Sequence, residues 1–199
     1  MIMLKGFLIG LSIAAPVGPI GVLCIRRTLS DGRIAGLVTG LGAASADAVY
    51  GSMAAFGLTL ITGFLVAQQN ILSIIGGIFL LYLGIRTFLS HPAEEPADVK
   101  RQGLPWAYLS TFFLTLTNPL TILSFAAIFA GLGLASEQHS LAAAILLVAG
   151  VFLGSATWWL FLSGAVSLFR NRFTLRAMAW VNRISGVIIV GFGLAALFL

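Results

Sequence analysis

An aspartate in the middle of an apolar stretch is the most informative residue of the chain. Of the six acidic residues, only Asp47 falls inside such a stretch, and the others lie in polar connections. At about 1.5 Å of rise per helical residue, Asp47 lies roughly 20 Å from one end of its stretch, near the middle of a bilayer core about 30 Å thick. Placing an acid at this depth costs about 2.5–3.5 kcal/mol, and such residues often serve ion or proton pathways. Asp47 is therefore predicted to bind a coupling proton or another cation. The alternative is a protonated carboxyl that only joins two helices by a hydrogen bond.

Prolines interrupt two of the apolar stretches, at Ala15-Pro16-Val17-Gly18-Pro19 and at Thr117-Asn118-Pro119. Proline lacks an N–H and clashes with the carbonyl four residues earlier, so a helix breaks there. The freed backbone groups must then be buried in protein or face a wet cavity. A half-helix beginning at Pro19 or Pro119 would present free N–H groups and a positive dipole end at the break, which suits an anion. Kinks that only aid packing are the alternative.

These features together predict a substrate site near the membrane midplane. Anion-binding helix ends opposite a buried carboxylate suit a zwitterion such as an amino acid. Gly18 would let a ligand approach the backbone, and the polar side chains around the second break would add hydrogen-bond donors and acceptors. The predicted substrate-binding residues are Pro16, Gly18, Pro19, Thr117, Asn118, Pro119 and Thr121, and the predicted ion-coupling residue is Asp47.

The composition is that of an integral membrane protein. Of the 199 residues, 59% are hydrophobic and only 9% are charged, whereas a soluble domain carries about 25% charged residues. The net charge of +5 does not indicate nucleic-acid binding, because the basic residues lie between the apolar stretches. The single cysteine excludes an internal disulfide and any CxxC centre. No cofactor and no metal site is predicted.

The continuous apolar runs predict helices rather than barrel strands. The six predicted spans are 4–25, 34–60, 71–90, 107–133, 141–168 and 178–199. Three of the connections between them are basic, and those at 61–70 and 134–140 contain no lysine or arginine. The basic connections would lie in the cytoplasm, which places both termini outside. Their basic residues are Arg26, Arg27 and Arg33, then Lys100 and Arg101, then Arg170, Arg172 and Arg176.

The predicted topology allows only an inverted repeat, because spans 1 and 4 then run in opposite directions. A short internal similarity supports it: 40–47 (GLGAASAD) aligns with 150–157 (GVFLGSAT). The chain is therefore predicted to be one all-α transporter domain over 1–199, with helices 1 and 4 broken at prolines. Repeat 1 would occupy about 1–90, a cytoplasmic linker 91–106, and repeat 2 about 107–199. Alternating access about a midplane site is expected of such an architecture.

Five motifs carry a family resemblance: Gly6–Gly10 with Ala15–Pro19, Arg26–Arg27 with Gly32, Gly40–Asp47, Tyr82–Gly84 with Arg86, and Asn118–Pro119. In these the chain resembles the lysine exporter (LysE/RhtB) family of bacterial amino-acid exporters. The resemblance implies six helices in the inner (plasma) membrane and outward export of amino acids or close analogues, driven by an ion gradient. It implies functional roles for Pro16, Gly18, Pro19, Asp47, Asn118 and Pro119, and it assigns no particular amino acid.

The sequence thus predicts a secondary transporter that works by proton-coupled antiport. Its predicted partners are an amino acid as substrate, protons or another coupling cation, and the lipid bilayer. Self-association into a homo-oligomer is left open. An intramembrane enzyme would need a nucleophile and a base, or metal ligands, that converge within the membrane. The only histidines, His91 and His139, fall in connections on opposite sides, so no enzyme is predicted. The remaining alternative is a membrane scaffold or assembly factor without a transported substrate.

Overall fold

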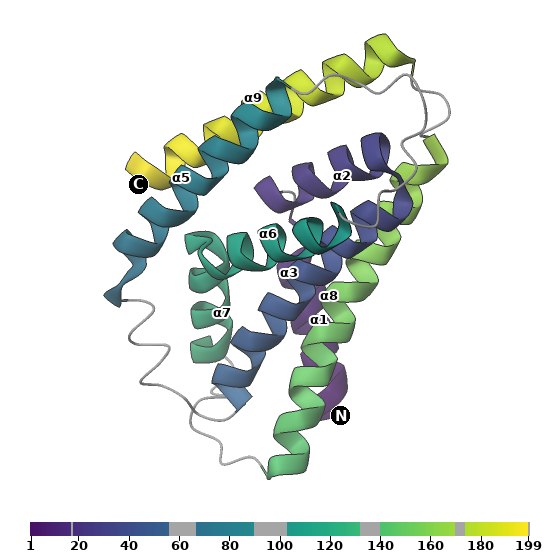
Figure 1. Cartoon of the computed structure of the whole chain (residues 1–199). Coiled ribbons are helices and arrows are strands. Elements are labelled where there is room, and N and C mark those ends of the chain that lie inside the picture. The colour runs from purple at the N-terminus through teal and green to yellow at the C-terminus, as the bar shows by residue number, and fades with distance from the viewer. Residues whose placement is uncertain (17, 56–66, 90–102, 132–139, 170–173, 199) are drawn as a thin grey trace.

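The computed structural model describes residues 1–16, 18–55, 67–89, 103–131, 140–169 and 174–198. These residues form helices and no strand (Figure 1), which confirms the all-α prediction for this part of the chain. The helices are α1 (Ile2–Ala14), α2 (Pro19–Asp31), α3 (Arg33–Ala55), α5 (Gln69–Phe88), α6 (Gly103–Leu116), α7 (Pro119–Gly131), α8 (Leu141–Phe169) and α9 (Leu175–Phe198).

The apolar runs fold into two kinds of helix. α3, α5, α8 and α9 are each long and apolar enough to cross a membrane. The other two runs are broken at their prolines, as predicted: α1 and α2 meet at an angle of 80°, and α6 and the start of α7 at 58°. The described residues therefore supply four spans, or up to six if each bent pair is one span.

The prediction that residues 26–33 form a connection between two spans is wrong. α2 continues to Asp31, and the chain turns into α3 at Gly32, whose φ of 98° favours glycine. Arg26 and Arg27 are thus helical. Helix α2 can carry them among apolar neighbours because their side chains find polar partners on neighbouring helices. α6 likewise begins at Gly103, inside the predicted linker, and α9 already includes Arg176.

Several predictions fall on parts of the chain outside the described residues. They concern the linker over 91–102, with Lys100 and Arg101, and the connection with Arg170 and Arg172. His91 and His139 lie outside the described ranges too.

Glycines bring the central helices close together. α1 packs against α8 through Gly6, Gly10, Gly150 and Gly154. A Cβ at Gly10 would run into the carbonyl oxygen of Val151, and a Cβ at Gly154 into that of Phe7. Small residues allow such close backbone approach in membrane helices. α3 also packs against α8 and against α6, so α3 and α8 form the centre of the molecule.

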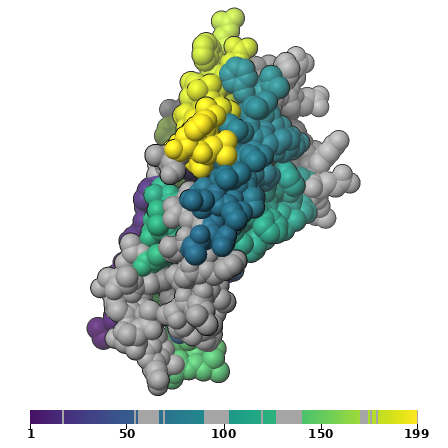
Figure 2. Space-filling model, turned by 90° about the vertical axis from the view of Figure 1, so that its left-hand side faces the viewer, coloured from purple at the N-terminus to yellow at the C-terminus, as the bar shows by residue number. Residues whose placement is uncertain are grey.

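α5 and α9 pack against each other as an outer layer, and Figure 2 shows them side by side on one face. Both helices expose large apolar side chains, among them Ile74, Ile78, Ile184 and Val187. An apolar surface of this extent is typical of a membrane-facing side.

Candidate functional site

A cavity of about 170 Å³ lies where the two broken helix pairs meet. It has room for on the order of ten water molecules, and hence for a small solute. Residues of the α1–α2 break, of α3, of the α6–α7 break and of α8 line it. Both proline segments therefore border a cavity, as their unpaired backbone groups require.

The N-terminus of α2 opens into this cavity. Pro19 is the first helical residue and Gly18 is the N-cap, with no side chain capping the helix. The first helical hydrogen bond runs from the Val22 N–H to the Gly18 carbonyl, at 3.1 Å. Within the described residues, the N–H groups of Ile20 and Gly21 have no partner. A Cβ at Gly18 would meet nothing within 4 Å. A negatively charged group can therefore reach the free N–H groups.

The N-terminus of α7 is arranged differently. α7 begins at Pro119, and the Leu120 N–H donates to Asn118 Oδ1 at 3.1 Å. Asn118 thus caps its own helix, as asparagine commonly does. The sequence predicts an anion site at each of the two helix ends, but the one at α7 is partly satisfied within the protein. The α2 end is the more open of the two.

Asp47 lines the cavity from α3 and is only 3% exposed. Its Oδ2 accepts a hydrogen bond of 2.7 Å from the Ser155 hydroxyl, which in turn accepts one of 3.1 Å from the Trp159 indole N–H. Both partners belong to α8. Oδ1 accepts no hydrogen bond from any described residue, which leaves it for a cation in the cavity. The described residues contain no group of three His, Cys, Asp or Glu side chains that could hold a metal ion.

The cavity brings together most of the predicted site residues: Pro16, Gly18, Pro19, Asp47, Asn118 and Thr121. Thr117 lies outside its lining: its backbone lies against Gly76 of α5, and its hydroxyl donates to the Phe113 carbonyl at 2.9 Å. Pro119 opens α7.

Sequence reasoning did not assign a role to Ser124 or to Ser155. Ser124 lines the cavity from α7 and lies three residues after Thr121, so helical periodicity could have found it. Ser155 lies 108 residues from Asp47 in sequence, and the internal alignment paired it with Ser45 instead. Of the two neighbouring tryptophans of α8, Trp159 lines the cavity.

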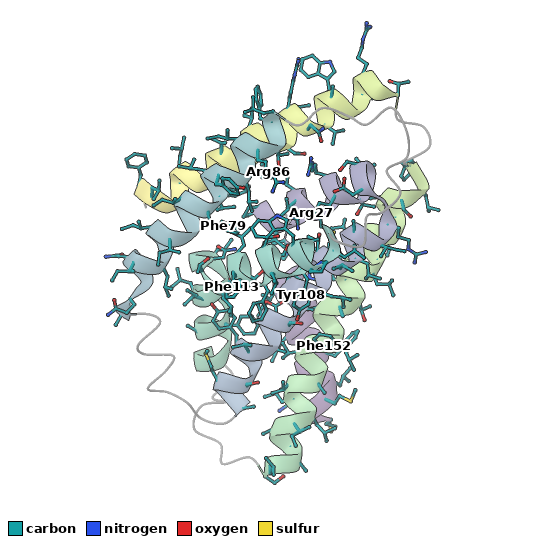
Figure 3. All side chains as sticks on the ribbon, viewed as in Figure 1. Arg27, Phe79, Arg86, Tyr108, Phe113 and Phe152 are labelled. Atoms are coloured by element: carbon teal, nitrogen blue, oxygen red, sulfur yellow. The ribbon has the colours of Figure 1, made fainter. Side chains whose placement is uncertain are left out.

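Arg27 fixes α2 against its neighbours (Figure 3), and it is only 6% exposed. Its guanidinium donates to neutral oxygens of two helices. On α3 the acceptor is Thr39 Oγ1 at 3.1 Å. On α6 the acceptors are the Ala107 carbonyl at 3.0 Å, Ser110 Oγ at 2.9 Å and Thr111 Oγ1 at 3.1 Å. Arg26 Nε donates to Asn182 Oδ1 of α9 at 3.2 Å. These contacts hold the half-helix whose free end faces the cavity.

Comparison with known proteins gives one family. The model of the LysE type translocator family matches residues 11–199. The chain is 31% identical to "Putative amino acid efflux protein YcgF" of Bacillus subtilis (strain 168), over 96% of this chain and 93% of that protein. It is 31% identical to "Uncharacterized membrane protein YahN" of Escherichia coli (strain K12), over 87% of this chain and 79% of that protein. No solved structure matches the chain significantly.

Proposed function

The chain belongs to the LysE type translocator family, and we propose that it exports amino acids or close analogues across the bacterial inner membrane. One observation carries the proposal: a cavity at the junction of both broken helix pairs holds Asp47 together with the uncapped end of α2. The relative from Bacillus subtilis is named "Putative amino acid efflux protein YcgF", which favours the same class of substrate.

The cavity offers complementary partners for both charges of an amino acid. The substrate carboxylate would accept hydrogen bonds from the N–H groups of Ile20 and Gly21, at the positive end of the α2 dipole. The substrate ammonium would donate to Asp47 Oδ1, which is the stronger, charge-assisted kind of hydrogen bond. A buried charge without a partner costs several kcal/mol, so a zwitterion is favoured over a singly charged solute.

Asp47 also provides a basis for proton-coupled antiport. A carboxyl that carries a proton has no charge to offer an ammonium group, so proton and substrate compete for the same side chain. A proton taken up from outside would release the substrate there, and its loss to the cytoplasm would make the carboxylate available to the next substrate molecule. The result is an exchange of one substrate for one proton. Membrane-buried acids serve as proton relays in pumps and transporters.

Alternating access between two inverted repeats fits the arrangement of the helices. α1 packs against α8 and α6 packs against α3, with α3 and α8 in contact at the centre. Each repeat would contain one half-helix that begins at a proline, and the cavity would lie between the repeats, as in many secondary transporters. The exposed Arg33, Arg86 and Arg176 lie at helix ends that would all face the cytoplasm, which favours outside termini.

Transport by the purified protein tests the proposal. Liposomes containing the protein are loaded with one labelled amino acid at a time, and efflux is followed after the outside solution is made acidic. We expect efflux of at least one amino acid that exceeds the leak of protein-free liposomes and slows when a protonophore removes the gradient. Efflux of every amino acid at the leak rate would contradict the proposal and favour a scaffold without a transported substrate.

A further inference from the structure

The charges around the cavity limit what it can hold. Among the described residues that line it, Asp47 is the only one with an ionisable side chain. Arg27, the nearest buried cation along α2, is instead directed at the neutral oxygens of α3 and α6. Asp47 can therefore neutralise one ammonium group, which is the one every amino acid has. A second ammonium or a second carboxylate on the side chain would find no oppositely charged side chain among these lining residues, and burying an unneutralised charge costs several kcal/mol.

The hydroxyl groups around the cavity are not equivalent. Thr115 Oγ1 donates to the Thr111 carbonyl at 2.8 Å, and Ser124 Oγ donates to the Leu120 carbonyl at 2.7 Å. These protons are already used within their own helices. Thr121 is only 8% exposed, and its hydroxyl has no hydrogen-bond partner among the described residues. A buried hydroxyl without a partner costs about 1–3 kcal/mol, so a partner from the cavity contents is favoured.

We infer that the cavity selects amino acids with an uncharged, hydroxyl-bearing side chain, and that Thr121 is the residue that recognises this hydroxyl. The inference rests on the proposed amino-acid export, since it names the kind of amino acid. The ammonium group of the substrate binds Asp47 Oδ1, and its carboxylate binds the N-terminus of α2. The side chain of the substrate is then left for the face of α7 that carries Thr121 and Ser124, where a hydroxyl pairs with Thr121.

Transport of L-threonine, L-valine and L-lysine into liposomes containing the protein tests the inference. Threonine and valine have the same shape and differ by a hydroxyl in place of a methyl. We expect threonine to be preferred over valine by roughly three- to tenfold in kcat/KM, the value of one hydrogen bond, and lysine to enter no faster than the leak. Thr121→Val keeps the shape of the side chain and should bring the threonine-to-valine ratio close to one, mainly by slowing threonine.

Two further variants serve as controls. Thr157→Val makes the same change on the exposed face of α8, where the hydroxyl only donates to the Leu153 carbonyl, and it should leave the ratio unchanged. Thr121→Ser retains the hydroxyl and should retain the preference, which separates recognition from any loss of folding in Thr121→Val.

Each contrary result has a distinct meaning. Transport of lysine as fast as threonine would overturn the inference about charge and leave amino-acid export standing. Equal slowing of threonine and valine in Thr121→Val would show that Thr121 contacts groups common to all amino acids, and recognition of the side chain would be wrong. Absence of transport for every amino acid would overturn the inference together with the proposed function.

Discussion

A single methyl group added at Gly18 probes the open end of α2. Gly18 lines the cavity, and its φ of −106° and ψ of −165° are extended backbone that alanine also adopts. A Cβ there would meet no protein atom within 4 Å. The methyl of Gly18→Ala would therefore occupy space beside the free N–H groups, where the carboxylate of the substrate is proposed to bind, and not space filled by protein.

The expected effects on binding and on folding differ in size. One extra methyl at a closely fitted site costs about 1–3 kcal/mol of binding, so KM should rise by at least about tenfold. Alanine is a poorer N-cap than glycine by about 1 kcal/mol, which lowers the melting temperature of a protein of this size by roughly 2–4 °C. Gly18→Ala should thus be a folded protein with a large defect in substrate binding.

Two other glycines provide controls for the transport assay in liposomes. A Cβ at Gly191, on the exposed side of α9, would also meet nothing within 4 Å, so Gly191→Ala should keep the wild-type KM. A Cβ at Gly154 would run into the Phe7 carbonyl, so Gly154→Ala should lower the melting temperature by forcing α1 and α8 apart. A wild-type KM for folded Gly18→Ala, or an equal rise in KM for Gly191→Ala, would refute the placement of the substrate at α2.

Two further substitutions test the contacts that hold the cavity walls. Arg27→Ala leaves buried oxygens on α3 and α6 without their donor and should lower the melting temperature in detergent by about 5–10 °C. The exposed Arg183→Ala should shift it by less than about 2 °C, and equal shifts in differential scanning fluorimetry would contradict the role of Arg27. Ser155→Ala releases one oxygen of the cavity carboxylate and should slow transport by roughly two- to tenfold. Ser167→Ala, whose hydroxyl only donates to the Gly164 carbonyl, should leave the rate unchanged.

Local rules made the breaks and the buried acid predictable from the sequence. Proline removes a helical hydrogen bond wherever it stands, so the starts of α2 at Pro19 and of α7 at Pro119 follow from residue type alone. Asp47 was identified because an acid in an apolar run is costly. The asymmetry between the two helix ends was readable too, since Asn118 is a favoured N-cap type and Gly18 has no side chain.

Contacts between distant segments could not be predicted in the same way. Hydropathy predicts that Arg27 lies in a loop, whereas it lies in α2. Its hydrogen-bond partner Thr111 lies 84 residues further along the chain, so the sequence around Arg27 does not reveal it. The hydrogen bond from Ser155 to Asp47 spans 108 residues. Thr117 has a residue type suited to a site, yet its hydroxyl is used by the preceding turn of its own helix. Such outcomes depend on how the helices pack.

Proton flux and substrate efflux, measured together in one preparation, test the coupling role of Asp47 most directly. Liposomes are loaded with the best substrate and a pH-sensitive dye, and the outside solution is then made acidic. Asp47→Asn is compared with the control Asp31→Asn, which removes a carboxylate at the far end of α2. The wild type and Asp31→Asn should release substrate while the lumen acidifies, and folded Asp47→Asn should do neither above the leak. Undiminished gradient-driven export by Asp47→Asn would contradict the claim that this buried carboxylate couples the proton to the substrate.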